Sequence, residues 1–324
     1  MLINPTKELI LPLGVQIGMK GFIRVQLINK FSGKCRWDSG FFPNKILDSG
    51  RNIMATQTSW ISYCHVGTDN TTPAAVQTGL LGRVAYTNTI RSTVTGTSTS
   101  PYFGWKRRTF RIPVGAGQGG QNLSEAGIGY GSAVNNLISR ALIIDPITQA
   151  PTTVTPLADE LVDVTYELRY YPPLVDVTQS VVMDSVTYDT VTRAAEVTNA
   201  TTWAVDIGNK IGEACTTVSD FRAYNGALGA ITTNPSGLTA NLASTSEVFN
   251  KAYSNNSYLI GIQANFPPAS FNVSGGGFRS VSIRTTAGSY QTSFTSNPGG
   301  NMVPKTNLKT MILVWDVSWV EGTI

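Results

Sequence analysis

The chain has 324 residues, which is enough for two domains that each bury a core. Apolar residues make up 41% of it, which excludes a disordered tail, and the weak net charge of +4, spread along the chain, argues against a nucleic-acid binder. Charged residues are only 14%, and Thr, Ser, Asn and Gly, which favour strands and turns, take their place. This composition fits a subunit of an assembly, and equally a plain β-rich, turn-rich protein.

The cysteines and the hydropathy pattern indicate the cellular compartment in which the protein is made. Cys35, Cys64 and Cys215 are odd in number and have no CxxC spacing, so a secreted disulfide scaffold is not expected. The N-terminal residues have no basic segment followed by an apolar run, and no apolar stretch approaches about 18 residues. We therefore expect no signal peptide and no membrane insertion, with synthesis in a cytoplasm.

The first half of the chain is predicted to form one β-rich unit, because apolar and polar residues alternate over several segments, as in half-buried strands. The expected elements are, in order, paired strands over 9–31, a turn at Ser32-Gly33, a short helix capped by Asp48 or Ser49 and reaching about Ser62, an exposed loop or hairpin tip at 87–100, a strand at 105–114, a glycine-rich region at 115–131, and strands at 137–144 and 161–171.

A second unit is predicted after Tyr171-Pro172-Pro173, since two successive prolines stop strand pairing. We place the boundary at 172–182, which gives an N-terminal domain at 1–175 and a C-terminal domain at 176–324. The expected elements are a strand from Val186, a short helix at 201–216, a turn-rich segment at 225–247, and strands at 258–266, 278–285, 289–295 and 309–320.

The two units echo each other in sequence. Residues 164–171 and 313–320 match in residue type position by position. Two preceding pairs of segments also correspond, namely 109–112 with 281–284 and 140–144 with 290–294. The pattern predicts an all-β fold of two tandem antiparallel β-sandwich domains with a few short helices, and duplication of one unit is a hypothesis.

One glycine motif imitates a nucleotide site. Gly115-Ala116-Gly117-Gln118-Gly119-Gly120 satisfies G-x-G-x-x-G after a predicted strand, and Asp145 ends a later one. The mechanism needs a helix that begins at the glycines, because its amides hold the pyrophosphate. Three further glycines within 121–131 make that helix implausible. A flexible hairpin loop followed by a short turn or strand is predicted instead.

Catalytic groups are sparse. His65 is the only histidine, and its neighbour Cys64 would point to the opposite face of a strand, so the two cannot easily form a thiolate–imidazolium pair. We expect His65 to be partly buried or in a loop. One histidine and scattered cysteines do not make a zinc site, and no D-x-D-x-D-G calcium pattern is present.

Acidic residues cluster around the predicted strand 161–171. Asp163 and Glu167 share its polar face, and we expect them to lie on a solvated sheet face and not in a glycosidase cleft. Arg107 and Arg111 share a face of strand 105–114, which is likewise expected to be solvated. The sequence predicts no catalytic, cofactor-binding or metal-binding residue.

Residues 42–50 fit the pattern F-x-N-x-I-x-x-x-G, and residues 122–129 fit the turn pattern N-L-[ST]-E-x-G-[VI]-G. Both patterns resemble motifs of tailed-bacteriophage tail and fibre-associated proteins. Further similar stretches lie at 137–143, 163–169, 223–232 and Pro304-Lys305-Thr306. The resemblance implies a non-enzymatic virion structural protein of the tail, neck or fibre apparatus. The chain lacks the repeats or heptads of a long trimeric fibre.

We therefore expect a structural subunit of a phage tail apparatus (collar, tail tip or baseplate, or short fibre) that mediates virion assembly and host attachment. Its expected partners are copies of itself, with a trimer as one option, other virion proteins, and host surface glycan or protein, but not nucleic acid. Candidate contact loops are 87–104, 115–131 and 225–247.

Three alternatives stay open. A stand-alone carbohydrate-binding module would need exposed aromatics, for which Trp37, Trp60, Trp105 and Trp203 are candidates. A capsid or head-decoration protein of similar sandwich type is another. An enzyme such as a depolymerase is disfavoured, because acid–base and metal constellations are missing.

Overall fold

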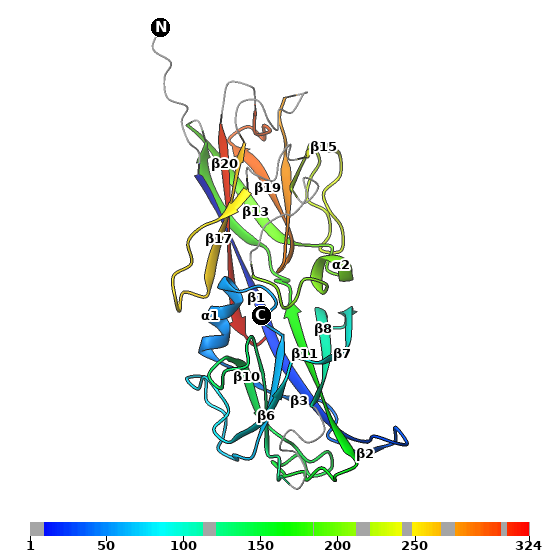
Figure 1. The fold of residues 1–324 in the computed structure, drawn as a ribbon. Helices are drawn as coiled ribbons and strands as arrows, with labels where there is room; N and C mark the ends of the chain where they lie inside the picture. The colour runs from blue at the N-terminus through cyan, green and yellow to red at the C-terminus, as the bar shows by residue number, and fades with distance from the viewer. Residues whose placement is uncertain are drawn as a thin grey trace.

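The computed structural model describes residues 10–112, 121–183, 185–211, 221–241, 248–266, 276–305 and 310–323. Within these residues the protein is built from three sheets and two short helices, which confirms the predicted all-β fold of sandwich-like units. Figure 1 shows two lobes stacked end to end in an elongated body. The predicted strands at 137–144, 161–171, 258–266, 278–285, 289–295 and 309–320 correspond, within a few residues at each end, to β10, β11, β17, β18, β19 and β20.

A nine-stranded sheet runs through both lobes. Its strand order is β16 (Val248–Asn250), β17 (Leu259–Phe266), β20 (Met311–Glu321), β1 (Ile10–Asn29), β11 (Glu160–Tyr171), β8 (Tyr102–Ile112) and β7 (Ile90–Thr99), with β2 (Cys35–Asp38) and β3 (Phe42–Pro43) also paired to β1.

Strand β1 joins the two halves of this sheet. Its residues 10–19 pair in parallel with β20, and its residues 18–29 pair antiparallel with β11. The predicted paired strands over 9–31 are therefore wrong: the described part, from Ile10, is a single strand of 20 residues. The chain does not need to reverse, because each half of the strand finds a partner from elsewhere. The turn at Ser32-Gly33 is confirmed, with Gly33 at φ +69°.

The lower lobe is a sandwich between the β11 end of this sheet and a five-stranded sheet. That second sheet has the order β4 (Lys45–Ile46), β10 (Leu137–Leu142), β9 (Glu125–Gly129), β5 (Tyr63–Gly67) and β6 (Arg83–Thr87). Every residue of β9 is buried, so this part of the predicted contact loop 115–131 is core. The motif at 115–120 lies outside the described residues.

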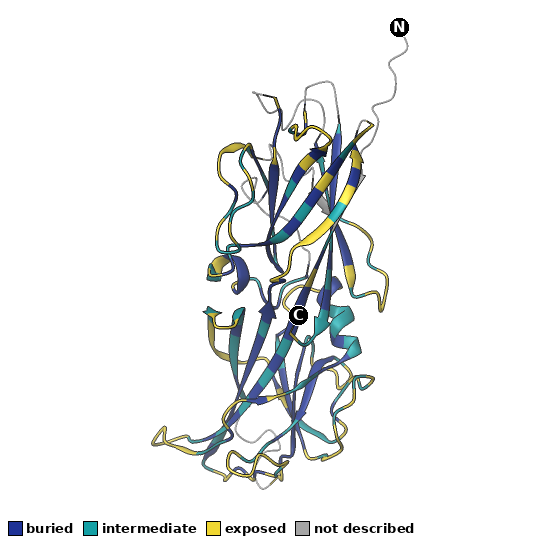
Figure 2. Ribbon diagram, turned by 180° about the vertical axis from the view of Figure 1, so that it is seen from behind, coloured by how far each residue is buried: buried dark blue, intermediate teal, exposed yellow. Residues whose placement is uncertain are grey.

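The upper lobe pairs the β20 end of the long sheet with a six-stranded sheet. The order of this third sheet is β12 (Val177–Met183), β13 (Val186–Ala195), β19 (Gly288–Asn297), β18 (Ser280–Thr285), β14 (Phe221–Tyr224) and β15 (Leu238–Asn241). Phe221 packs between the layers, with ring centroids 4.9 Å from Phe266 and 5.1 Å from Trp315. One hydrophobic cluster continues through both lobes, and Figure 2 shows the buried strand segments along its length.

Both helices are shorter than predicted. Helix α1 (Asp48–Thr56) begins after Leu47, whose side chain makes no capping hydrogen bond, so the expected cap at Asp48 or Ser49 is wrong. Gly50 is required inside this helix, because a Cβ there would lie 2.3 Å from the carbonyl oxygen of Ile138 on β10. The helix therefore packs directly on the second sheet.

Helix α2 (Ala200–Trp203) has only four residues, whereas a helix was expected over 201–216. The side chain of Asn199 caps it by accepting a hydrogen bond from the amide of Thr201. Beyond it Gly208 has φ +96°, a left-handed conformation that an α-helix does not allow. The part of the predicted helix beyond Ile211 lies outside the described residues.

The echoed segments are only partly equivalent in the fold. Strands β11 and β20, which contain 164–171 and 313–320, lie on either side of β1. Residues 109–112 belong to β8 in the long sheet, but 281–284 belong to β18 in the third sheet.

The chain passes from the lower to the upper lobe between β11 and β12, within the predicted boundary region. Strand β1, which belongs to the range 1–175, contributes to both lobes.

Candidate functional site

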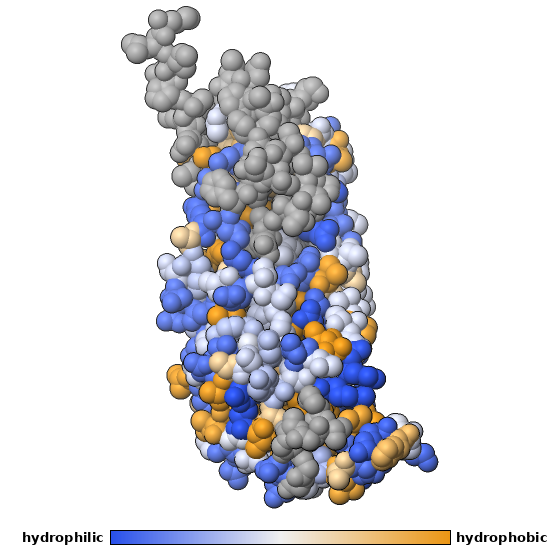
Figure 3. Space-filling view, viewed as in Figure 1, coloured by the Kyte–Doolittle hydropathy of each residue, from blue (hydrophilic) through white to orange (hydrophobic). Residues whose placement is uncertain are grey.

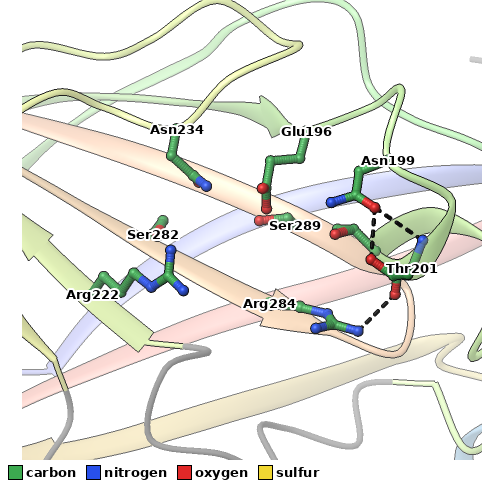
Figure 4. Close-up of a pocket in the computed structure, with 9 residues that line it drawn as sticks. Glu196, Asn199, Thr201, Arg222, Asn234, Ser282, Arg284 and Ser289 are labelled. Atoms are coloured by element: carbon green, nitrogen blue, oxygen red, sulfur yellow. Dashed lines mark hydrogen bonds between the residues drawn. The ribbon is translucent and has the colours of Figure 1, made fainter.

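A polar pocket lies in the upper lobe, on the outer side of the third sheet. It encloses about 200 Å³. Its lining comes from strands β14, β18 and β19, from the segment 196–202 and from the loop that carries Asn234. Figure 4 shows these side chains around the pocket. The lining residues are Glu196, Asn199, Thr201, Thr202, Arg222, Asn234, Ser282, Arg284 and Ser289. All nine are polar or charged, so the pocket suits a hydrophilic ligand.

Strand register builds the floor of this pocket. Arg222 on β14 pairs with Ser282 on β18, which in turn pairs with Gln291 on β19, so the three side chains share one face of the sheet. Two residues further along β18, Arg284 points to the same side. This face of the third sheet therefore carries a row of polar residues, whereas a face packed into the core would carry apolar ones.

The buried side chain of Gln291 holds the loop that forms one wall. Its amide nitrogen donates to the carbonyl oxygens of Ala230 and Thr233 over 3.0 and 3.1 Å, and its Oε1 accepts from the amide of Gly229 over 2.8 Å. These bonds fix the segment that carries Asn234. This part of the predicted turn-rich segment 225–247 therefore lies against the sheet.

The charged groups of the pocket are not equally satisfied. Arg284 donates to the carbonyl oxygen of Thr201 over 2.6 Å and lies 3.8 Å from the carboxylate of Asp206. Arg222 has no ion-pair partner among the described residues, and its Nε is enclosed without a hydrogen-bond partner. The Oδ1 of Asn234 is enclosed in the same way. Among the enclosed side-chain atoms of the described lining residues, one donor and one acceptor are thus without a partner.

Glu196 reaches the pocket from the loop between β13 and α2. Its backbone has φ +53°, which is costly for a residue with a Cβ. The lining therefore contains two guanidinium groups and one carboxylate, together with hydroxyls and side-chain amides. Groups of these types can bind and orient a ligand through hydrogen bonds.

A second polar recess lies in the lower lobe and is much more open. It is lined by Thr68, Asn70, Gln121, Asn122, Ser124, Thr153 and Thr155. Three of these residues come from the predicted contact loop 115–131, so part of that loop does reach a surface recess. Its lining lacks charge.

The predicted solvated carboxylates are in fact buried. Asp163 is 5% exposed and Glu167 is 1% exposed. Both pair with arginines directly opposite on β8: Arg111 holds Asp163 through two bonds of 2.6 Å, and Arg107 binds Glu167. The prediction failed because long arginine side chains cover the shorter acids.

The same two acids do not have the spacing of a glycosidase pair. Asp163 and Glu167 are four residues apart on one strand, which places them about 13 Å apart, beyond the ~5–9.5 Å that separates such carboxylates. Above them the guanidinium of Arg107 lies 4.3 Å from the ring of Trp105. That of Arg169 lies 4.1 Å from the ring of Phe22. These contacts make a closed layer of charge pairs and rings.

His65 and Cys64 lie on opposite faces of β5, as predicted from their adjacency. Cys64 is part of the hydrophobic core, where burial raises the pKa of its thiol. His65 is fully buried, its Nε2 lies 3.0 Å from the carbonyl oxygen of Gly131, and Arg83 approaches its Nδ1 at 3.5 Å. Burial lowers the pKa of His65 to about 4. The lowered pKa keeps this ring neutral at neutral pH. The expectation that His65 is partly buried or in a loop was wrong, because the residue lies on β5 with its side chain fully buried.

The tryptophans proposed as sugar platforms do not form one exposed surface. Trp60 is 0% exposed and Trp203 is 1% exposed, so both belong to the core. Trp37 is partly buried against that core, and Trp105 lies beneath Arg107. Two of the four candidates are therefore excluded from ligand contact.

Within the residues that the structure describes, no three His, Cys, Asp or Glu side chains cluster in a way that could hold a metal ion. Among the same residues, no helix is long and apolar enough to cross a membrane.

No protein-family model, curated protein or solved structure matches this chain. The pocket was missed from the sequence because its lining residues are common polar types brought together from separate segments.

Proposed function

We propose that this chain is a non-enzymatic structural subunit of a bacteriophage tail apparatus, such as a collar, a tail tip or baseplate, or a short fibre. It assembles with copies of itself and with other virion proteins, and it contacts the host surface. The motif resemblance supports this, and its residues are scaffold positions here: Phe42, Ile46 and Leu123 are each at most 2% exposed. Motifs of this kind mark a fold.

The observation that carries the assembly role is the open edge of the long sheet at β7. This strand pairs with β8 on one side and with no other described strand. Ile90 is 41% exposed and Val94 is 51% exposed on it. Arg91 is its single charged residue, whereas edge strands that avoid association commonly carry Lys or Pro. A second chain can therefore add a strand here through main-chain hydrogen bonds.

Apolar surface at the lower lobe offers a further contact area. Val76, Leu81 and Val134 are 79%, 58% and 44% exposed around a shallow recess of about 280 Å³. Figure 3 shows that apolar residues occur in small groups among polar ones on the face drawn. Small groups of this kind suit contacts with several neighbours better than one extensive dimer interface.

The test is the mass of the purified protein by light scattering, followed by labelled-antibody imaging of phage particles. The proposal predicts an oligomer, with a trimer as the first symmetry to examine, and label at the tail or neck. Label on the head would instead support a capsid or head-decoration protein. A monomer at all concentrations, together with unlabelled particles, would contradict the proposal.

A stand-alone carbohydrate-binding module is the second candidate, and the polar pocket on the third sheet favours it. Such a module would bind sugar as a monomer, whereas an attachment subunit would bind it as part of an oligomer. Glycan-array binding measured beside the light-scattering mass separates the two.

A further inference from the structure

The polar pocket of the upper lobe contains two unsatisfied atoms of opposite kind. The Nε of Arg222 is an enclosed donor without an acceptor, and the Oδ1 of Asn234 is an enclosed acceptor without a donor. Enclosed polar atoms are normally hydrogen-bonded, because leaving one unpaired is destabilising. Both atoms border the same space, from β14 and from the loop that Gln291 holds. A single ligand can satisfy both.

The charges indicate what that ligand presents. Arg222 has no carboxylate partner among the described residues, while Arg284 lies only 3.8 Å from Asp206. Arg222 is therefore the guanidinium available to an anion, and a planar carboxylate is its best-matched acceptor. Glu196 and Asn234 supply acceptors on other sides of the pocket. Those acceptors require hydroxyl donors on the same ligand.

The size and lining restrict the ligand further. The enclosed space of about 200 Å³ is smaller than the ~300–1,000 Å³ of sites for drug-sized molecules, and no aromatic residue lines it. A small, polyhydroxylated molecule with a carboxylate fits these properties. We propose that this pocket binds a sugar acid: one pyranose ring whose carboxylate pairs with Arg222 and whose hydroxyls donate to Asn234 and Glu196.

The inference does not rest on the virion assignment, because it concerns the isolated pocket. Sugar binding by a monomer would support the pocket and contradict the assembly role, and an oligomer that binds no sugar acid would do the reverse. The two proposals therefore fail separately.

The experiment is saturation-transfer NMR on the full chain with glucuronate, with glucose as the matched neutral sugar and inorganic sulfate as a competitor. We expect glucuronate to bind and glucose to bind at least about tenfold more weakly, because glucose lacks the charged partner for Arg222. Arg222→Met should weaken glucuronate binding at least about tenfold, and Asn234→Ala about threefold or more. The control Arg91→Met removes an exposed arginine on β7 and should leave binding unchanged.

Circular dichroism and the melting temperature show whether each variant is folded. If Arg222→Met is unfolded, Asn234→Ala and the comparison of glucuronate with glucose decide. Absence of glucuronate binding to the wild-type chain would overturn the proposal. Equal loss in Arg222→Met and Arg91→Met would do so too, as would sulfate that binds as tightly as glucuronate, since a plain oxyanion site needs no sugar.

Discussion

Arg140 and Glu125 form an ion pair with no exposed surface on either side chain. The Nε of Arg140 donates to Oε2 of Glu125 over 2.7 Å, within the second sheet. The same guanidinium binds Gln77 over 2.8 Å and Asp69 over 3.1 Å, so it holds a long surface segment to the sheet. Glu125 belongs to the motif at 122–129, and its buried partner explains why an acid stands in a core strand.

Removing one member of this pair should be strongly destabilising. We expect Glu125→Gln to lower the free energy of unfolding by about 3 kcal/mol or more, because the buried Arg140 would keep only the partly exposed Asp69 as a charge partner. Asp69→Asn, at the 29% exposed end of the network, should be much less destabilising, because solvent screens this part of the network. Urea unfolding monitored by tryptophan fluorescence measures both, and equal losses would show that burial does not decide the cost.

His65 should make the protein acid-sensitive. Burial lowers the pKa of this histidine from 6.5 to about 4, with Arg83 adding to the effect and the carbonyl of Gly131 opposing it. The unfolded chain therefore takes up a proton between pH 6.5 and 4 while the folded chain does not, and stability falls as the pH drops through that window. One pKa unit corresponds to about 1.4 kcal/mol, so the full loss approaches about 3 kcal/mol.

The measurement for this histidine is direct, because the sequence has only one. Its imidazole NMR signal should titrate near pH 4 in the folded protein. The variant His65→Gln should show a weaker dependence of stability on pH between 4 and 6.5. A titration near the usual pKa of 6.5 would contradict the buried neutral ring.

Lys106 should affect stability at alkaline pH, whereas His65 affects it at acidic pH. Its side chain is 7% exposed, its Nζ donates to the carbonyl oxygen of Val205 over 2.8 Å, and burial lowers its pKa from 10.5 to about 8. Arg108 adds to this shift and Asp206 opposes it. The folded state is penalised for the charged amine below pH 8, and the penalty disappears as the pH rises to 10.5.

We therefore expect wild-type stability to rise by up to about 3 kcal/mol relative to Lys106→Met between pH 8 and 10.5. The comparison with the variant cancels the titration of other lysines and of tyrosines. Denaturant midpoints at several pH values provide the measurement. A constant difference across this range would mean that Lys106 titrates normally.

The open edge at β7 gives a test of assembly. Val94→Lys places a charge on the exposed edge, and adding a strand there would remove that charge from water, which is unfavourable. The variant oligomer should therefore dissociate at a higher protein concentration than the wild-type oligomer. Val175→Lys is the matched control, since Val175 is 80% exposed between β11 and β12 and outside any strand. Light scattering over a dilution series compares the two, and dissociation of both to the same extent would place the contact elsewhere.

The sequence predicted the strands well where alternation alone decides, as in β11, β17 and β20. It failed for β1, because this strand changes its pairing partner half-way along its length. Such a change leaves no pattern in the residues of the strand itself. It also failed for Asp163 and Glu167, whose burial depends on arginines that lie 52 and 60 residues away in the sequence. The pocket was beyond reach for the same reason: Arg222 and Asn234 become a pair only when Gln291 fixes the intervening loop.

The pairing of β1 with β20 has a consequence for biosynthesis. Residues 18–29 of β1 can pair with β11 once Tyr171 has left the ribosome, whereas residues 10–19 must wait for a partner that begins at Met311. Until then the growing chain presents an apolar ribbon with one unoccupied side, which is prone to premature association. This half of β1 therefore stays unpaired while the residues between β11 and β20 are synthesised, and slow or stalled translation over that interval should favour aggregation.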